Sequence, residues 1–414
     1  MKIKEVIVTF CALSLIGFGG IFVGDSLRVP VIEPPVKPLT IPVCGNFATG
    51  TVRCLSEVVI DPISLTSATS SPVGYGPAQF LGAYGLTGIT ATNTTIGIVA
   101  YSYHPYILHD VNEYSDVFGI QRLNDCSVDA GSTSTPCFEA INENGAVPTS
   151  PINPNWSLEI SLDVEVAHAV CQNCNILLCE SKSAAWGHMF SCIDRLRERG
   201  VKIISNSWAG PESPALVGYD TYLNYPGISF LFSSGDWNYG VYYPASSPYA
   251  LAVGGTTLYL TDHGGGVYSR ATEYVWNHAG SGCSVYSAQQ SWQTDLGLSG
   301  CSNRIVADVS AVANPATGAA VYDSIMYLRQ KGWRVVGGTS LSTPLIAGVQ
   351  ALAGVPDPEV MANSVPYYSK TSENLYDITS GANGSCSPSY LCTGVAGYDG
   401  PSGLGTPNGY TAFK

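Results

Sequence analysis

The chain has 414 residues, 45% hydrophobic and 12% charged, enough apolar material for one large domain or two of average size. Its formal net charge is −13 and its 18 lysines and arginines form no basic cluster, so nucleic acid is excluded as an expected partner. Glycine (45), proline (26) and tyrosine (25) are abundant, which favours a loop-rich α/β or β protein over a helical bundle.

The N-terminal segment is typical of an exported protein. Lys2 and Lys4 precede an apolar run from Val6 to Val23, as in a secretory signal or an uncleaved anchor, and no clear cleavage site separates these two alternatives. We therefore expect residues 1–24 to be a signal peptide or membrane anchor, and the protein to be secreted or extracytoplasmic, with or without a membrane tether.

A change of composition follows this segment. Residues 25–74 are rich in proline, serine and threonine, which predicts an extended tether. The compact domain is then expected to occupy residues 75–414.

Cysteine usage also indicates an oxidising compartment. Cys11 lies in the apolar run, and the other twelve of the 13 cysteines are an even number that favours disulfides. The pairs that lie close in sequence are Cys44/Cys54, Cys126/Cys137, Cys283/Cys301 and Cys386/Cys392. The pairing of Cys171, Cys174, Cys179 and Cys192 stays open. A zinc half-site in "CQNC" would need a second CxxC or paired histidines, and neither completes it.

Strands and helices are predicted to alternate along the rest of the chain. Apolar runs predict strands over 94–102, 175–180, 201–208, 228–236 and 251–256, and helices over 157–170, with Ser157 as the N-cap, and 184–199, ended by Gly200. Such alternation predicts βαβ units and a mostly parallel sheet, in which functional side chains gather at the carboxyl ends of the strands. "SNSW" (205–208) and "SSGD" (233–236) both fall at such ends.

A candidate nucleophile lies near the C-terminal end of the chain. In "VGGTSLSTPLIAG" (336–348), small residues surround Ser340 and an apolar helix follows, which is a typical setting for a serine nucleophile. A serine hydroxyl needs a base beside it, yet none of the six histidines lies in a setting that suggests one.

Carboxyl groups supply a candidate base. Glu159 and Asp163 are four residues apart on a predicted helix and share one face. Two neighbouring carboxylates repel, so one pKa is raised and a proton can be shared between them. In acid a carboxylate is a better-matched base than imidazole, so Glu159 can take the proton of Ser340 while Asp163 orients it. Asp236, kept protonated at the end of its strand, can donate a hydrogen bond to an oxyanion.

Together these residues, in this order, resemble the sedolisin family of serine-carboxyl peptidases. The similarity runs from about Tyr75 to the C-terminus and is carried by "EISLD", "SSGD" and "GGTSLSTP". It implies an α/β, subtilisin-like fold with a mostly parallel central sheet flanked by helices and a C-terminal calcium-binding loop region. It also implies an acid-active endopeptidase in which Ser340 is the nucleophile, Glu159 the general base, Asp163 its partner and Asp236 the oxyanion acid.

The resemblance further implies a bound calcium ion and a substrate-binding edge. Hard cations prefer oxygen ligands, which glycine-rich loops can supply. The matching positions are the side chains of Asp377 and Asp399 and the carbonyls of Ile378, Val395 and Gly397. The matching edge segment, which pairs with substrate backbone in related folds, is Ser207, Trp208 and Ala209, where the family often has glycine in place of the alanine. We expect the Trp208 side chain to pack rather than to join the carboxylates.

The N-terminal region departs from the pattern of the family. Family members usually carry a large N-terminal prodomain, whereas only about 75 residues precede the similarity here, so a shortened or absent prodomain is implied. We expect a monomer that acts on proteins or peptides. The alternative is a non-catalytic, secreted, calcium-binding domain that retains the peptidase fold.

Overall fold

The computed structural model describes residues 38–61, 68–91, 94–127 and 136–414. The predicted signal or anchor segment, with Cys11 and the first part of the predicted tether, lies outside the described residues. Leu39–Lys414 form one unit, which begins before the domain start predicted near Tyr75. Residues 39–60 contribute three short strands, and their apolar side chains, among them Cys54 and Val58, are buried against the core.

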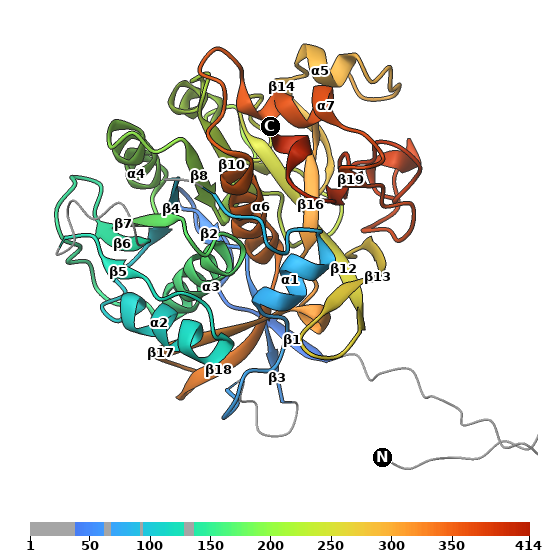
Figure 1. Cartoon of the computed structure of the whole chain (residues 1–414). Coiled ribbons are helices and arrows are strands. Elements are labelled where there is room, and N and C mark those ends of the chain that lie inside the picture. Colours follow the sequence, from blue (N-terminus) through green and yellow to red (C-terminus); the bar gives the residue numbers. More distant parts are fainter. Residues whose placement is uncertain (1–37, 62–67, 92–93, 128–135) are drawn as a thin grey trace, which may run out of the picture. The chain divides into compact units, whose positions relative to one another are not determined.

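The central sheet is mostly parallel, as predicted (Figure 1). Its order is β13-β12-β10-β8-β4-β7-β6-β5, with β16 beside β12, and the pairing of β12 with β13 is antiparallel. Its strands are β4 (Thr95–Tyr101), β5 (Asn124–Asp125), β6 (Cys137–Ile141), β7 (Asn175–Ser181), β8 (Ile203–Asn206), β10 (Ser229–Ser233), β12 (Leu251–Asp262), β13 (Tyr268–Val275) and β16 (Val309–Val312).

Smaller sheets complete the strand inventory. The sheet β1-β3-β18-β17 is antiparallel, and β11-β9-β2 forms a three-stranded sheet. Their strands are β1 (Leu39–Pro42), β2 (Arg53–Cys54), β3 (Glu57–Ile60), β9 (Trp208–Pro211), β11 (Tyr242–Tyr243), β17 (Ala319–Tyr327) and β18 (Gln330–Gly337), beside the pairs β14 (Gly282–Ala288) with β15 (Asn303–Val306) and β19 (Leu375–Tyr376) with β20 (Thr406–Pro407).

Helices flank the central sheet. Helices α3 and α6 pack against each other and against strands of this sheet, and β17 contacts α3 as well. The α-helices are α1 (Pro77–Ala83), α2 (Ile107–Phe118), α3 (Pro154–Val170), α4 (Trp186–Glu198), α5 (Ser291–Thr294), α6 (Thr339–Ala353) and α7 (Val365–Ser369). No helix of the described residues is long and apolar enough to cross a membrane.

Helix α3 is buried along most of its length. Every residue from Trp156 to Val170 is buried, so this helix has no solvated face. The helix begins earlier than predicted, because Asn153 rather than Ser157 is the N-cap. The Asn153 side chain accepts hydrogen bonds from the amides of Asn155 and Trp156, and Pro154 occupies the first turn, where its missing N–H costs nothing.

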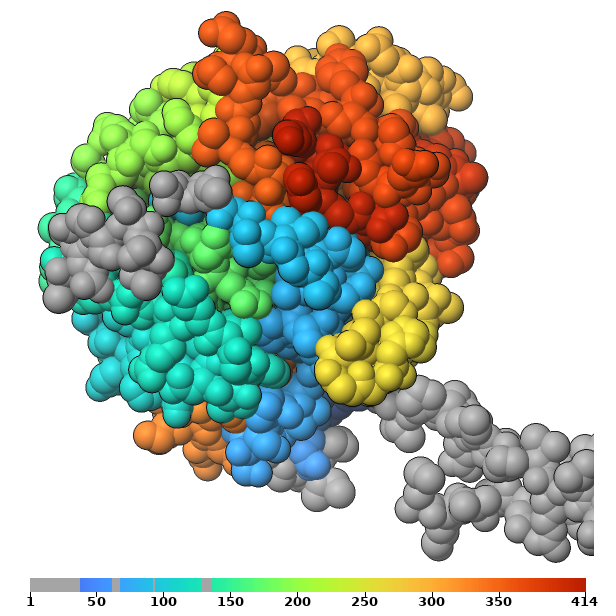
Figure 2. Space-filling view, viewed as in Figure 1, coloured from blue at the N-terminus to red at the C-terminus, as the bar shows by residue number. Residues whose placement is uncertain are grey.

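The C-terminal segment packs against the start of the domain. The Gly409 amide donates to the carbonyl oxygen of Tyr84 at 2.7 Å, just after α1. Figure 2 shows the blue α1 region on the surface between the red C-terminal segment and the yellow β12–β13 region. This contact joins residues far apart in sequence.

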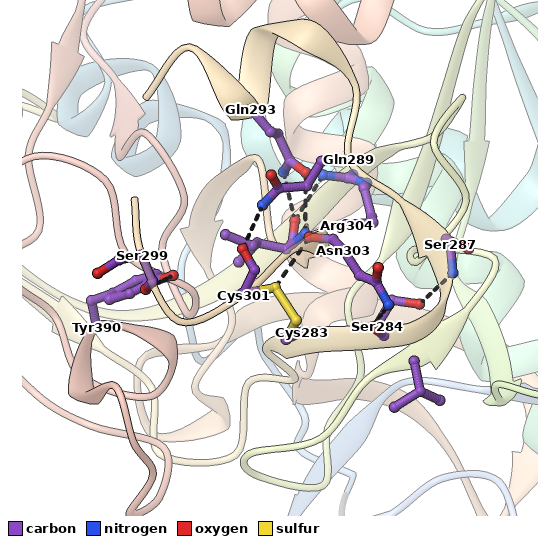
Figure 3. The surroundings of a disulfide bond; sticks show 12 residues. Cys283, Ser284, Ser287, Gln289, Gln293, Ser299, Cys301, Asn303, Arg304 and Tyr390 are labelled. Carbon is purple, nitrogen blue, oxygen red and sulfur yellow. Dashed lines mark hydrogen bonds between the residues drawn. A yellow bond between two sulfur atoms is a disulfide. The ribbon is translucent and has the colours of Figure 1, made fainter. Parts of the chain in front are cut away.

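Six disulfides connect the twelve cysteines of the described residues. The four pairs predicted from sequence proximity are present. The open cluster resolves into Cys171–Cys174 and Cys179–Cys192, so "CQNC" is a disulfide rather than a zinc half-site. Figure 3 shows Cys283–Cys301 joining β14 to the segment just before β15, beside the 2.9 Å hydrogen bond from Asn303 Nδ2 to the Ser284 carbonyl.

A buried carboxyl group on β7 couples the stability of the fold to pH. Glu180 is 0% exposed, and its Oε1 accepts the His104 amide at 2.7 Å. Burial raises the pKa of Glu180 to about 8, although this hydrogen bond opposes the shift. The folded state therefore binds a proton that the unfolded chain releases above its ordinary pKa of about 4.3. The stabilising contribution is full below that value and is lost as pH rises through about 8.

The first prediction concerns this residue. Glu180→Gln keeps an acceptor for His104 but carries no charge, so its stability should fall less than that of the wild type between about pH 4 and pH 8. The losses of stability in the variant and in the wild type should differ by at most about 1.4 kcal/mol for each unit by which the pKa of Glu180 is shifted. Thermal unfolding at both pH values measures it. Glu359→Gln, an exposed glutamate, is the matched control, and a parallel loss in Glu180→Gln and wild type would contradict the argument.

Candidate active site

Helix α3 places two of the predicted site residues one turn apart. Glu159 and Asp163 are 0% and 1% exposed. Burial raises the pKa of Glu159 to about 7, and the nearby Ser340 and Ser56 oppose this shift. Neither carboxyl oxygen of Glu159 has a hydrogen-bond partner among the described residues. Burial raises the pKa of Asp163, the neighbouring Glu159 raises it further, and a 2.6 Å hydrogen bond from Ser207 Oγ opposes the shift. The two carboxyls therefore lie close enough for the charge of Glu159 to raise the pKa of Asp163.

Ser340 lies in the first turn of α6, after β18. Gly338 makes the turn between them with φ 98°, and a Cβ there would lie 2.2 Å from the carbonyl oxygen of Leu55. Ser340 Oγ donates to the Ser207 carbonyl at 3.3 Å. Pro344 has no N–H for the Ser340 carbonyl, and Ser207 Oγ lies 3.5 Å from that oxygen instead. Ser207 thus contacts both Asp163 and the start of α6, a link that the sequence did not reveal.

Asp236 follows β10 and reaches the same turn. Its Oδ1 accepts the N–H and the Oγ–H of Thr339, both at 2.8 Å. Its Oδ2 is buried without a hydrogen-bond partner among the described residues, and it lies 2.6 Å from where a Cβ on Gly338 would be. Burial raises the pKa of Asp236 well above its ordinary value, and the nearby Glu57 raises it further. A protonated Oδ2 can therefore donate a hydrogen bond beside Ser340.

The predicted substrate edge is strand β9 with the residue before it. The Trp208 indole is fully buried and donates to the Val99 carbonyl at 3.1 Å, so it packs in the core as expected. Ala209 lies on the edge of β9 that pairs with β2. The strand that occupies this edge comes from the segment that the sequence assigned to a tether.

That segment adds residues to the site that sequence reasoning missed. Burial lowers the pKa of Arg53, while Asp236 and Glu57 act in the opposite direction. The Glu57 carboxylate pairs with His278 Nδ1 at 3.0 Å. In the sequence, these residues are indicated only by the short, mixed apolar run "VRCLSEVVI" (52–60), which lies between linker-like stretches.

The predicted calcium loops come together. The Gly397 amide donates to Asp377 Oδ2 at 2.8 Å, and the Val395 amide donates to Asp399 Oδ2 at 3.1 Å. Burial raises the pKa of Asp399 to about 7, and Asp377 raises it further, so the two carboxyls lie near each other. A Cβ on Gly394 would lie 3.0 Å from the Ile378 carbonyl oxygen. Only glycine permits this approach, and the oxygen-rich donor set fits a hard cation.

A second grouping with ligand-like spacing consists of His104, Asp110 and Asp323, all buried. His104 Nε2 lies 3.5 Å from Asp110 Oδ2 and 3.4 Å from Asp323 Oδ1. Asp323 also faces the buried Arg334 guanidinium. These contacts describe a buried ionic cluster, and we assign no metal to it.

Comparisons with known proteins agree with the fold. The model of the subtilase family matches residues 109–374. Sedolisin from Pseudomonas sp. is 28% identical over 82% of this chain and 61% of its own length, and kumamolisin from Bacillus sp. is 29% identical over 67% and 54%. This chain thus spans between about half and three fifths of the length of these curated relatives.

A solved structure supports the same architecture. That of Pseudomonas sedolisin, a serine-carboxyl proteinase, has a TM-score of 0.67 at 24% identity, covering 82% of this chain and 96% of the other. At this identity the likeness establishes the fold alone. The family match over residues 109–374 shows that the chain belongs to the subtilase family, and sedolisin and kumamolisin are among its curated relatives.

Proposed function

We propose that this chain is an acid-active serine-carboxyl endopeptidase that hydrolyses protein or peptide substrates outside the cytosol. The observation that carries the proposal is the convergence of Ser340, Asp236 and the Glu159–Asp163 pair at the start of α6. All four side chains are buried, and the pKa of each carboxyl is raised. The sedolisin relatives and the six disulfides support the same activity and compartment, with residues 1–24 as the export segment.

In the proposed reaction, Glu159 takes the proton of Ser340 as Oγ attacks the substrate carbonyl carbon. A rotation of the Ser340 side chain directs Oγ from the Ser207 carbonyl toward this carboxylate. Asp163, fixed by the hydroxyl of Ser207, orients Glu159 and stabilises the proton that it receives. Glu159 then passes the proton to the leaving amine, and water releases the acyl group from Ser340.

Two hydrogen-bond donors stabilise the negative charge of the tetrahedral intermediate in this proposal. The Ser340 amide lies at the N-terminus of α6, where the helix dipole also favours negative charge. The protonated Oδ2 of Asp236 is the second donor. Its other oxygen is held by Thr339, so the donor is fixed before the reaction begins.

The second prediction tests the nucleophile and the base. Ser340→Ala and Glu159→Gln should each lower kcat/KM for an added peptide by about 10⁴-fold, because the two residues act as a unit. Glu165→Gln is a matched control on the same buried helix: it keeps an acceptor for the Tyr322 amide and should retain most activity. Equal activity of wild type and Ser340→Ala would favour the non-catalytic domain instead.

The third prediction concerns pH. Activity requires Asp236 protonated and Glu159 able to accept a proton. Burial raises the pKa of Glu159 to about 7, and we infer that water entering the cleft with substrate would lower it. The optimum should therefore lie at about pH 3–5. Asp236→Asn keeps a neutral donor, so it should extend activity to higher pH while losing rate at the optimum. An unchanged alkaline limb in this variant, or a wild-type optimum above about pH 7.5, would contradict the assignment.

The fourth prediction concerns calcium, which we propose binds the side chains of Asp377 and Asp399 and the carbonyls of Ile378, Val395 and Gly397. When bound, it neutralises the two carboxylates and ties the C-terminal loops together. A native-state ligand at a hundredfold excess over Kd stabilises by about 2.7 kcal/mol.

Melting temperatures at about pH 6, measured with calcium and with EGTA, test this site. Wild type should melt higher with calcium, and Asp377→Asn should lose the difference. Asp357→Asn, an exposed aspartate, is the control and should keep the difference. Equal wild-type melting temperatures in the two buffers, with no metal found by elemental analysis, would exclude the site.

A further inference from the structure

One of the two proposed oxyanion donors belongs to the peptide group that joins Thr339 to Ser340. Its N–H points out of α6, because the Ser340 amide donates to the Leu55 carbonyl oxygen at 3.0 Å. The other end of this peptide group is the Thr339 carbonyl. The two ends are conjugated, so a hydrogen bond that the carbonyl oxygen accepts polarises the N–H and makes it a stronger donor.

Three hydroxyl groups gather at the Thr339 carbonyl oxygen, and all three side chains are 0% exposed. Ser342 Oγ donates to it at 2.9 Å and Thr343 Oγ1 at 2.8 Å, both from α6 itself. Such bonds within a helix are common for serine and threonine. Ser233 Oγ also donates to it, at 3.0 Å, from a residue 106 positions earlier at the end of β10. This third bond has no such local explanation.

Ser233 and Thr343 act as a pair. Their hydroxyl oxygens lie 2.7 Å apart, and each hydroxyl has a single proton to donate. When one of them donates to the other, the second donates to the Thr339 carbonyl, so either direction of the relay ends at this oxygen. Hydrogen bonds in such a relay strengthen one another, and the absence of water strengthens them further.

The same end of β10 also positions the second proposed donor. The Gly235 amide donates to Thr339 Oγ1 at 3.2 Å, and Asp236 Oδ1 accepts the N–H and the Oγ–H of Thr339. With Ser233 on the carbonyl, residues 233–236 therefore contact the N–H, the hydroxyl and the carbonyl of Thr339. These contacts fix the Ser340 amide and the Asp236 carboxyl relative to each other.

We propose that Ser233 and Thr343 are positioning residues of the oxyanion site, whose paired hydroxyls hold and polarise the Thr339 carbonyl so that the Ser340 N–H donates more strongly. This inference rests on the proposed function. Neither hydroxyl contacts the reacting atoms or transfers a proton to the substrate. Their effect lies in the transition state, because a stronger donor stabilises the oxyanion more than it stabilises the neutral carbonyl of the bound substrate.

A double variant tests this role in the full chain. Ser233→Ala/Thr343→Val removes both hydroxyls and keeps the branched shape of residue 343. Its kcat for an added peptide at about pH 4 should fall about tenfold, less than on loss of a donor itself, while KM stays within about twofold. Each single variant should lose less, because the remaining hydroxyl still reaches the carbonyl. If the double variant does not fold, Ser342→Ala/Thr343→Val also removes two of the three hydroxyls and should show the same loss of kcat.

The matched control is Ser229→Ala. Ser229 Oγ donates to Gln350 Oε1 at 2.7 Å, which is another buried hydrogen bond between β10 and α6, distant from Thr339. Its loss should leave kcat within about twofold of the wild type, although the fold is destabilised in the same way. The double variant should also keep the pH profile of the wild type, because both Asp236 and Glu159 are unchanged.

A second measurement does not depend on activity. Protein labelled with ¹³C at threonine carbonyls and ¹⁵N at serine amides gives correlated NMR signals from Thr–Ser pairs alone, and the signal of Thr339–Ser340 is absent in Ser340→Ala. In the double variant the Thr339 carbonyl should move to lower ¹³C frequency, because it accepts fewer hydrogen bonds. In Ser229→Ala it should not move.

The outcomes distinguish the two proposals. If the double variant keeps kcat within about twofold of an active wild type, or Ser229→Ala loses as much, this inference is overturned and the proposed function stands. An unmoved Thr339 carbonyl signal, or a KM that rises as far as kcat falls, would also overturn it. A wild type without Ser340-dependent hydrolysis between about pH 3 and pH 7 would refute the proposed function, and this inference with it.

Discussion

Burial of carboxyl groups on an apolar helix is the constraint on which the rest of this molecule depends. Helix α3 is buried on all sides, yet it carries Glu159, Asp163 and Glu165. An ionised carboxylate without water around it costs several kcal/mol, so the pKa of each group is raised and the folded state takes up protons. Burial is then the one physical cause of both the proposed acid chemistry and the uptake of protons by the folded state. A histidine base would gain nothing from burial on this helix.

The site also requires that separate parts of the chain come close together at the start of α6. Gly338 has no side chain, and this absence lets Asp236 Oδ2 and the Leu55 carbonyl meet beside the Ser340 amide. Gly338 therefore provides both the turn from β18 to Ser340 and the space for a reacting carbonyl. Replacement of Gly338 would remove both, because its positive φ also disfavours other residues.

Much of the architecture could be predicted from the sequence, because it rests on long apolar runs. The strands near 95–101, 175–181 and 229–233 and the helix through Glu159 are such runs, and the parallel sheet follows from their alternation. The convergence of Glu159, Asp163, Asp236 and Ser340 could be predicted from spacing and strand ends together with the family resemblance. Finer features depended on local competition: Asn153 precedes a proline and so caps α3, although Ser157 is also a common capping residue.

The strands before Tyr75 could not be predicted from the sequence for a different reason. Strand β2 has two residues, and β1 and β3 have four each, so their propensity carries little information. They are strands because partners distant in sequence, such as Ala209 for Arg53 and Val336 for Val58, offer unpaired edges. The pairing of Cys171, Cys174, Cys179 and Cys192 likewise depended on which atoms the fold brings together.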